Sequence, residues 1–207
     1  MKQIPKTNVS FEDWILFFTE EVPNHVTETR FQHILRVANY AESLAKIHGH
    51  PYPKKAYLAG LCHDITKQKK SEVHSKLFQE YSLDLNDIPS QALHAFSAPL
   101  WLEKEYGFSD PEIAKAISSH TLGNTSPSLL DQILYAADFL GSDFAFRQPD
   151  LSLWVAKTEE NLLYGVFMKA SQTISFLMEK KEVIHPYTFQ MYNRSANLIK
   201  ENQIDVT

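Results

Sequence analysis

Apolar residues recur along this chain at the three- and four-residue spacing of helices. The clearest case lies in the segment 31–45, whose apolar members are Phe31, Ile34, Leu35, Val37, Ala38, Ala41, Leu44 and Ala45. Residues at this spacing line one face of an amphipathic helix. We find no alternating run rich in Val, Ile and Thr and bounded by turn signals, so we expect an all-α protein.

Capping signals divide the chain into about nine helices. Ser10, followed three residues later by Asp13, begins the first, and Asp110 with Pro111 begins the sixth. The expected helices span approximately 11–22, 28–48, 54–64, 72–81, 90–106, 112–120, 127–140, 151–181 and 186–201, with a loop at 141–149. Together they predict a compact helical bundle around a single core.

Composition and charge narrow the class of protein. The chain has 207 residues, of which 43% are hydrophobic, and this suits one globular domain. The net charge of −5 gives no sign of a broad basic face, so we expect no nucleic-acid partner. The apolar segment 11–18 could cover the core or form a homodimer contact, and the sequence leaves both open.

The cysteine content and the hydropathy of the chain indicate in which cellular compartment the protein functions. Cys62 is the single cysteine, which excludes an internal disulfide and fits a reducing compartment. Residues 1–10 lack the apolar run of a signal peptide, and no apolar stretch is long enough to span a membrane. We therefore expect a cytoplasmic protein without a membrane partner.

The first candidate functional residues are His63 and Asp64, which follow an apolar helical segment of small residues. Neighbouring side chains on a helix diverge by about 100°, so they rarely share a ligand unless a metal ion lies at the helix edge. Imidazole and carboxylate together suit a divalent ion. Lys67 follows Asp64 by three residues, on the same helix face, and could hold an anionic substrate. The alternative is that the His63–Asp64 pair, like many lone His-Asp pairs, marks a helix end with a hydrogen-bonded histidine.

Further candidates lie on other expected helices. His33, His94 and His120 fall on the second, fifth and sixth helices, and Asp138 lies near the end of the seventh. Each stands among small or apolar neighbours, where a carboxylate is costly unless it is paired or bound to a metal. Converging helices could bring all six groups to one place.

The order His, His-Asp, His, His, Asp resembles the HD-domain metal-dependent phosphohydrolases. The flanking residues narrow this resemblance to the YqeK group, which is similar to symmetrical diadenosine tetraphosphate hydrolases. The segments that carry it are 30–33, 61–67, 93–94, 116–123 and 133–138. They span about residues 30–138, and the C-terminal helices match only weakly.

The resemblance implies a role for each matching residue. His33, His63, Asp64 and Asp138 match the four metal ligands shared by HD-domain proteins, and His94 and His120 match the pair that binds a second metal, with Asp64 bridging the two. Asp64 and Lys67 would be catalytic, Lys67 as a phosphate contact, and Thr121 and Gly123 match the turn after the fifth histidine. In the group an Arg follows the last Asp after a short loop that contains Pro; here the loop is longer and lacks that Pro, and Arg147 is our candidate.

The resemblance also implies an organisation and an activity. Within a single domain, 1–207, we expect an N-terminal helical extension (about 1–25), a metal-site core (about 30–140) and C-terminal helices (about 150–202). Two divalent ions, iron by first preference with manganese or zinc as alternatives, would activate a hydroxide to attack an inner phosphorus of a dinucleoside tetraphosphate. Diadenosine tetraphosphate would give two ADP. The alternatives are a 5′-nucleotidase or other nucleotide phosphohydrolase of this class, and a metal-containing nucleotide sensor with little turnover.

Overall fold

The computed structural model describes residues 9–84 and 87–201, which form helices and turns without a strand. The described α-helices are α1 (Phe11–Glu21), α2 (Glu28–Ile47), α3 (Pro53–Cys62), α4 (Ser71–Glu80), α5 (Leu93–Tyr106), α6 (Pro111–Ser119), α7 (Leu129–Leu140), α8 (Asp143–Phe146), α9 (Leu151–Glu160), α10 (Leu162–Lys180) and α11 (Pro186–Glu201). Two short 3-10 helices, Val22–Asn24 and Ser90–Ala92, precede α2 and α5. The all-α fold expected from the periodicity is confirmed.

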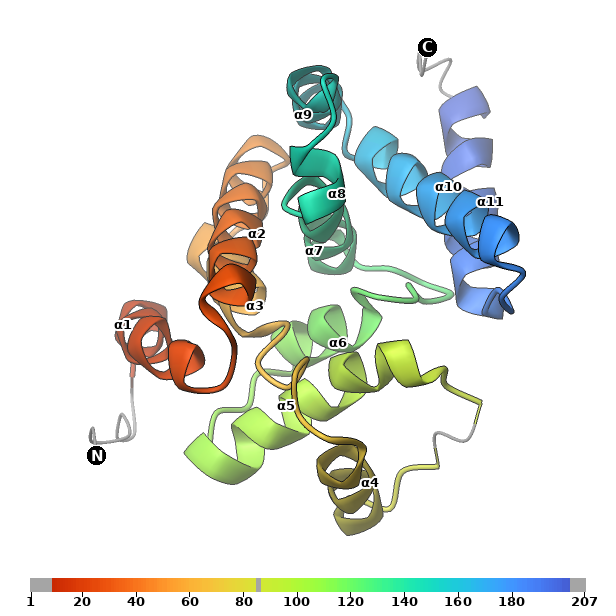
Figure 1. Ribbon diagram of the computed structural model, residues 1–207. Coiled ribbons are helices and arrows are strands. Elements are labelled where there is room, and N and C mark those ends of the chain that lie inside the picture. Colours follow the sequence, from red (N-terminus) through yellow and green to blue (C-terminus); the bar gives the residue numbers. More distant parts are fainter. Residues whose placement is uncertain (1–8, 85–86, 202–207) are drawn as a thin grey trace.

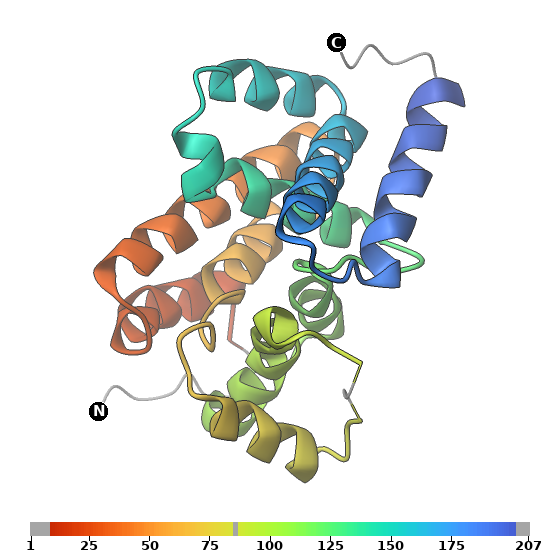
Figure 2. The ribbon, with the colours of Figure 1, turned by 45° about the vertical axis from the view of Figure 1, so that its right-hand side comes forward.

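Helix α7 lies at the centre of the bundle. It packs against α2, α3, α6 and α10, while α2 and α3 run along each other and α11 covers α10. Figure 1 shows α7 between the α2–α3 pair and the α10–α11 pair, and the turned view in Figure 2 shows α10 and α11 side by side. Helices α5 and α6 close one end of this arrangement, and α4 lies against α5. This arrangement brings the ends of α3, α6 and α7 near the middle of the molecule.

The hydrophobic core extends from α1 to α11. Its fully buried side chains include Phe18 of α1, Ile34 of α2, Leu58 of α3 and Ile133 of α7, and Met191 of α11 is 1% exposed. The closest approach is at Gly60 of α3, where an added Cβ would lie 2.7 Å from the Cα of Ala38. The run of small residues in α3 therefore lets the backbones of α2 and α3 nearly touch.

Helix α1 covers one side of this core. Its expected N-cap is confirmed, because the Ser10 hydroxyl accepts from the backbone of Asp13 and the Asp13 carboxylate accepts from the backbone of Ser10. Trp14 stacks on Phe18 at 5.5 Å and meets the ring of Phe108 at 5.0 Å. These contacts favour the alternative in which α1 covers the hydrophobic core. A homodimer contact through this helix stays a prediction.

The third helix is shorter than expected. It ends at Cys62, so His63 is its C-cap, and Asp64 and Lys67 lie in the turns that follow. The Lys67 amide donates to the carbonyl oxygen of Asp64 at 2.9 Å, which closes one of these turns. The expectation that Asp64 and Lys67 share a helix face is therefore wrong, although the tight turn keeps them close.

Two further differences raise the helix count from about nine to eleven in the described residues. The segment 141–149, expected as loop, contains α8, whose N-cap Ser142 accepts from the Ala145 amide. The helix expected at 151–181 is broken at Asn161, which has an extended backbone (φ −146°, ψ 113°) and caps α10 through the Leu163 amide. No helix in the described part of the chain has the length and apolar character needed to cross a lipid bilayer.

Candidate metal centre

Six side chains from five helices converge where α3, α6 and α7 end. His33 lies in the second turn of α2, His94 is the second residue of α5, and Asp138 lies near the end of α7. His63 and His120 are the C-caps of α3 and α6, and Asp64 follows His63 directly. The four histidines and Asp64 are all at most 4% exposed. The convergence expected from the sequence is therefore present in the fold.

Backbone carbonyls orient three of the four imidazoles. His63 Nδ1 lies 2.6 Å from the Gly60 carbonyl oxygen, and His120 Nδ1 lies 2.6 Å from that of Ile117. His33 Nδ1 lies 3.0 Å from the carbonyl oxygen of Gly141. A carbonyl can only accept, so each Nδ1 carries the proton and each Nε2 keeps a free lone pair. Such an imidazole is prepared to bind a metal through Nε2.

The carboxylate of Asp64 lies between two pairs of histidines. Its Oδ2 is 3.7 Å from His33 Nε2 and 3.6 Å from His63 Nε2. Its Oδ1 is 3.2 Å from His94 Nε2 and 3.7 Å from His120 Nε2. One oxygen therefore faces each pair, which is the arrangement that a bridging carboxylate needs.

Asp138 completes the group around His33 and His63. Its Oδ1 lies 3.3 Å from His33 Nε2 and 3.5 Å from His63 Nε2. Its other oxygen, Oδ2, lies 2.6 Å from the ammonium group of Lys169. The lysine thus occupies one oxygen of Asp138 and leaves the other for the cluster.

These residues fit two divalent cations. His33 Nε2, His63 Nε2 and Asp64 Oδ1 are buried and have no hydrogen-bond partner among the described residues, although buried polar atoms are normally satisfied. Two groups bring ligand atoms within 4.8 Å of one another, namely His33, His63 and Asp64, and Asp64, His94 and His120. Imidazole and carboxylate donors of this kind suit divalent transition metals.

Electrostatics favours the metal-binding protonation state at Asp64 and His120, while at His63 burial lowers the pKa but the carboxylates of Asp64 and Asp138 raise it above its usual value. Burial alone would raise the pKa of Asp64, but His63 and His94 hold that pKa well below its usual value. Burial lowers the pKa of His120 well below its usual value, and the neighbouring His63 lowers it further. A carboxylate beside a neutral imidazole is the form in which both are ligands.

Three further polar side chains contact the cluster. Lys67 Nζ lies 3.3 Å from His94 Nε2 and 3.5 Å from the Gln91 carbonyl oxygen. The Thr121 hydroxyl lies 3.0 Å from His120 Nε2, and Arg30 Nη1 donates to Asp64 Oδ2 at 3.2 Å. Lys67 and Thr121, predicted as substrate contacts, are thus beside the second histidine pair, whereas Arg30 is a cation on the Oδ2 side of Asp64, which faces His33 and His63.

The other two predicted substrate contacts have different surroundings. Gly123 has a positive φ of 82°, and a Cβ there would lie 2.1 Å from the Met191 side chain, so its backbone and packing both require glycine. Arg147 is the exposed C-cap of α8, where its Nε donates to the Asp143 carbonyl oxygen at 2.9 Å. Among the described contacts of Arg147, none reaches the six clustered groups.

Sequence reasoning missed Lys169. This residue of α10 is 6% exposed, and its ammonium group donates to Asp138 Oδ2 and, at 2.5 Å, to the carbonyl oxygen of His120. It also lies 4.2 Å from the centroid of the Tyr135 ring. The sequence does contain a signal for this residue, namely a single lysine among Val166, Phe167, Met168 and Ala170. Because lysine is rarely fully buried without a partner, a lysine at such an apolar position indicates a buried ion pair.

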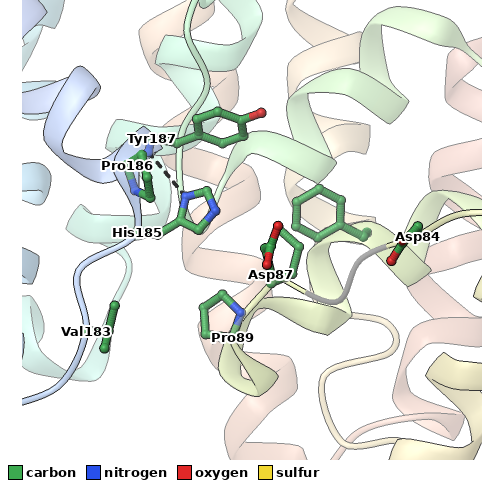
Figure 3. Close-up of a pocket in the computed structure, with 9 residues that line it drawn as sticks. Asp84, Asp87, Pro89, Val183, His185, Pro186 and Tyr187 are labelled. Carbon is green, nitrogen blue, oxygen red and sulfur yellow. Dashed lines mark hydrogen bonds between the residues drawn. The ribbon is translucent and has the colours of Figure 1, made fainter.

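Two cavities among the described residues are large enough for a small organic ligand. The larger, of about 850 Å³, lies between the segment before α5 and the start of α11. Figure 3 shows Pro89 and Asp87 on one wall and His185, Pro186 and Tyr187 on the other. None of its described lining residues is one of the six clustered groups. The second cavity, of about 460 Å³, borders the cluster directly through Asp138 and Lys169.

Comparisons with known proteins agree with this geometry. Residues 30–141 match the profile of the HD domain. A protein named symmetrical bis(5′-nucleosyl)-tetraphosphatase from Halalkalibacterium halodurans is 32% identical over 84% of this chain and 92% of its own length. One of the same name from Bacillus subtilis is 30% identical over 83% and 92%. A Clostridium acetobutylicum structure, titled as a predicted HD superfamily hydrolase involved in NAD metabolism, superposes with a TM-score of 0.79 at 27% identity, over 91% of this chain and 98% of that one.

Proposed function

Because this chain belongs to the HD-domain family, we propose that it hydrolyses dinucleoside tetraphosphates, converting diadenosine tetraphosphate into two ADP. The observation that carries this proposal is the pair of ligand groups that share Asp64. Two relatives named for the symmetrical reaction cover more than four fifths of the chain, which supports the choice of substrate. The expected cytoplasmic location remains part of this proposal.

The family is metal-dependent, and we propose two divalent ions, with iron as first preference and manganese or zinc as alternatives. When bound, such a pair lowers the pKa of a water molecule and neutralises the charge of phosphate oxygens. His33, His63 and Asp138 would hold one ion, His94 and His120 the other, and Asp64 would give one oxygen to each. The unpartnered Nε2 atoms of His33 and His63 support this assignment.

Cationic and hydroxyl groups beside the cluster would orient the substrate. The Lys67 ammonium group lies next to His94, where it can donate to an anionic oxygen of the tetraphosphate. Thr121 places a hydroxyl beside His120 for the same purpose. We retain Gly123 and Arg147 as proposed substrate contacts, Gly123 through its backbone and Arg147 through a change in its present orientation.

The products decide between this function and its alternatives. The protein, purified without chelator and with its metals counted by elemental analysis, is incubated with diadenosine tetraphosphate. We expect about two metals per chain and ADP as the single product. ATP with AMP would contradict the symmetrical cut, and release of inorganic phosphate from mononucleotides would indicate a nucleotidase. Tight nucleotide binding without turnover of any substrate would indicate the sensor.

A histidine variant tests whether the second ligand group is needed. His94→Ala removes one Nε2 beside Asp64 Oδ1 and should lower the metal content toward one per chain. We expect hydrolysis to fall more than the roughly 10–100-fold that loss of an outer partner of a ligand costs. His185→Ala, in the loop before α11, is the matched control and should retain both metals and activity. Unchanged hydrolysis in His94→Ala would contradict a two-metal site.

A further inference from the structure

The smaller cavity lies between α7, α8 and α10, against the metal centre. Its volume of about 460 Å³ is in the range of sites for small organic ligands. Asp138 and Lys169 form its boundary with the cluster, and Phe144 of α8 and Phe176 of α10 also line it. A molecule in this cavity would therefore contact the metal centre and two aromatic rings.

The face of α10 that lines the cavity changes in character along the helix. Lys169, Thr173 and Phe176 follow one another at four- and three-residue spacing, so they share one face of the helix. Since each residue advances the helix by 1.5 Å, Phe176 lies roughly 10 Å from Lys169 along the axis. Lys169 contacts Asp138 at the metal centre. Going outward, the wall begins at the Lys169–Asp138 ion pair beside the metal centre and becomes polar, then aromatic, which is the order that phosphate, ribose and base require.

Aromatic rings at the outer end are exposed without an apolar covering. Phe176 is 55% exposed and Phe144 is 47% exposed. The Phe144 ring is held by Phe139 and Trp154, each with its centroid 6.4 Å away, which leaves part of the ring open. The Phe176 ring has the Lys180 ammonium group 5.9 Å from its centroid. Rings exposed in this way are stacking surfaces for a nucleobase.

Polar side chains lie between the charged and aromatic ends. Gln172 offers an amide with both donors and an acceptor, and Thr173 offers a hydroxyl group, while the Ser142 hydroxyl is already used in capping α8. An amide of this type can pair with adjacent donor and acceptor atoms of a base, and the Thr173 hydroxyl suits a ribose. The cavity therefore contains a partner for each part of a nucleoside.

We propose that this cavity holds one nucleoside of the substrate, with its base against Phe176 and Phe144 and its phosphates directed toward Asp138 and Lys169. The proposal rests on the proposed function in that it deepens the same site. It assigns to α8 and α10 the recognition of a nucleoside 5′-diphosphate unit, such as the ADP formed as product.

Phe176→Ala tests the proposal by comparing two ligands. Binding of ADP and of inorganic pyrophosphate to the full-length purified protein is measured by calorimetry. We expect ADP to bind about tenfold more weakly to Phe176→Ala, because base stacking is lost, and pyrophosphate to bind unchanged. The KM for diadenosine tetraphosphate should rise while kcat stays within about twofold. Met178→Ala, a 66% exposed neighbour on α10 that does not line the cavity, is the control and should change neither.

Each result decides one question. Unchanged ADP affinity and KM in Phe176→Ala overturn the nucleoside site and leave hydrolysis, measured on the wild-type protein, intact. Equal loss of ADP and pyrophosphate binding also overturns it, because Phe176 would then act through the fold. A wild-type protein that does not hydrolyse diadenosine tetraphosphate rejects the proposed function, while selective loss of ADP binding in the variant would still support the nucleoside site.

Discussion

At the scale of single residues, the candidate metal centre depends on which ring nitrogen each histidine turns inward. His63 and His120 occupy equivalent places at the ends of α3 and α6, and each ring turns back to a carbonyl three residues earlier. That carbonyl belongs to the last helical turn, where the usual amide four residues later no longer continues the helix, and the Ile117 carbonyl also accepts from the His120 amide at 3.3 Å. One hydrogen bond therefore caps the helix and also directs Nε2 toward Asp64.

Lys169 controls the second carboxylate, and its replacement should weaken metal binding. Lys169→Met leaves the partly buried Asp138 Oδ2 without its charged partner, and the His120 carbonyl loses a donor. We expect metal affinity to fall by roughly 10–100-fold, as for loss of other outer partners of metal ligands. Metal titration of the purified protein measures this. Lys200→Met, on the exposed end of α11, is the control, and equal metal affinity in both variants would contradict the role.

The sequence was sufficient to predict which residues form the cluster, but not which residues hold and orient them. His33, His94 and Asp138 were predicted because their types and order matched a pattern, and the fold brings them together. Lys169 lies 31 residues beyond Asp138, so no local spacing connects the two. The orientation of each ring also depends on tertiary contacts, as for His33 and the distant Gly141 carbonyl.

At the scale of elements, the contact between α2 and α3 fixes the position of His63. An Ala at Gly60 would place its Cβ 2.7 Å from Ala38 Cα and 2.9 Å from Ala38 N, which are backbone atoms. We expect Gly60→Ala to lower the free energy of unfolding by about 1–3 kcal/mol, as overpacking does. Urea unfolding checks this. At an exposed helical position the same change would stabilise the helix, so a gain in stability would show that the helices do not meet closely at Gly60.

His25 connects Glu21 at the end of α1 with Tyr106 at the end of α5. We expect this contact to weaken in acid, when His25 becomes protonated. Its Nε2 lies 3.0 Å from Glu21 Oε1 and 2.8 Å from the Tyr106 hydroxyl, and its Nδ1 lies 2.9 Å from the Lys69 ammonium group. Burial lowers the pKa of His25 from 6.5, and together with the nearby Lys69 it outweighs the opposite effect of the hydrogen bond to Glu21. Neutral His25 can accept from Lys69 while it donates to Glu21, and protonated His25 cannot.

This lowered pKa determines the direction of the pH effect. The unfolded chain binds the proton more readily, so the stabilising contribution of His25 is complete above pH 6.5 and is lost as the pH falls below that value. We expect the melting temperature to drop less between pH 7.5 and pH 5.5 in His25→Gln than in the wild-type protein. Thermal unfolding of both proteins at the two pH values measures the difference. Equal drops would assign the acid sensitivity to other groups.

Helix boundaries were less predictable than helix existence. Periodicity and capping residues predicted the nine major helical segments, because both are local signals. The end of α3 at Cys62 and the break at Asn161 were missed. At both places the sequence remains compatible with a helix, and the structure ends it because a side chain makes a better local contact, with the Gly60 carbonyl in one case and the Leu163 amide in the other.

At the scale of the whole molecule, the candidate metal centre lies where separate parts of the bundle meet. Its side chains come from α2, α5 and α7 and from the ends of α3 and α6, while Lys169 connects it to α10. Without cations, the buried carboxylate of Asp64 and the unpartnered histidine nitrogens would oppose this convergence. Metal binding should therefore stabilise the fold as a whole and not only the site.

Chelation measures this coupling. A ligand at 100 times its Kd stabilises the native state by about 2.7 kcal/mol, and each kcal/mol shifts the melting temperature of a chain of this size by about 2–4 °C. We expect chelator to lower the melting temperature by roughly 5–10 °C. Asp64→Asn lacks the charged carboxylate shared by both ligand groups, so chelator should hardly change its melting temperature. An equal drop in the variant would mean that the stabilising cation lies elsewhere, because loss of the shared ligand should remove the effect.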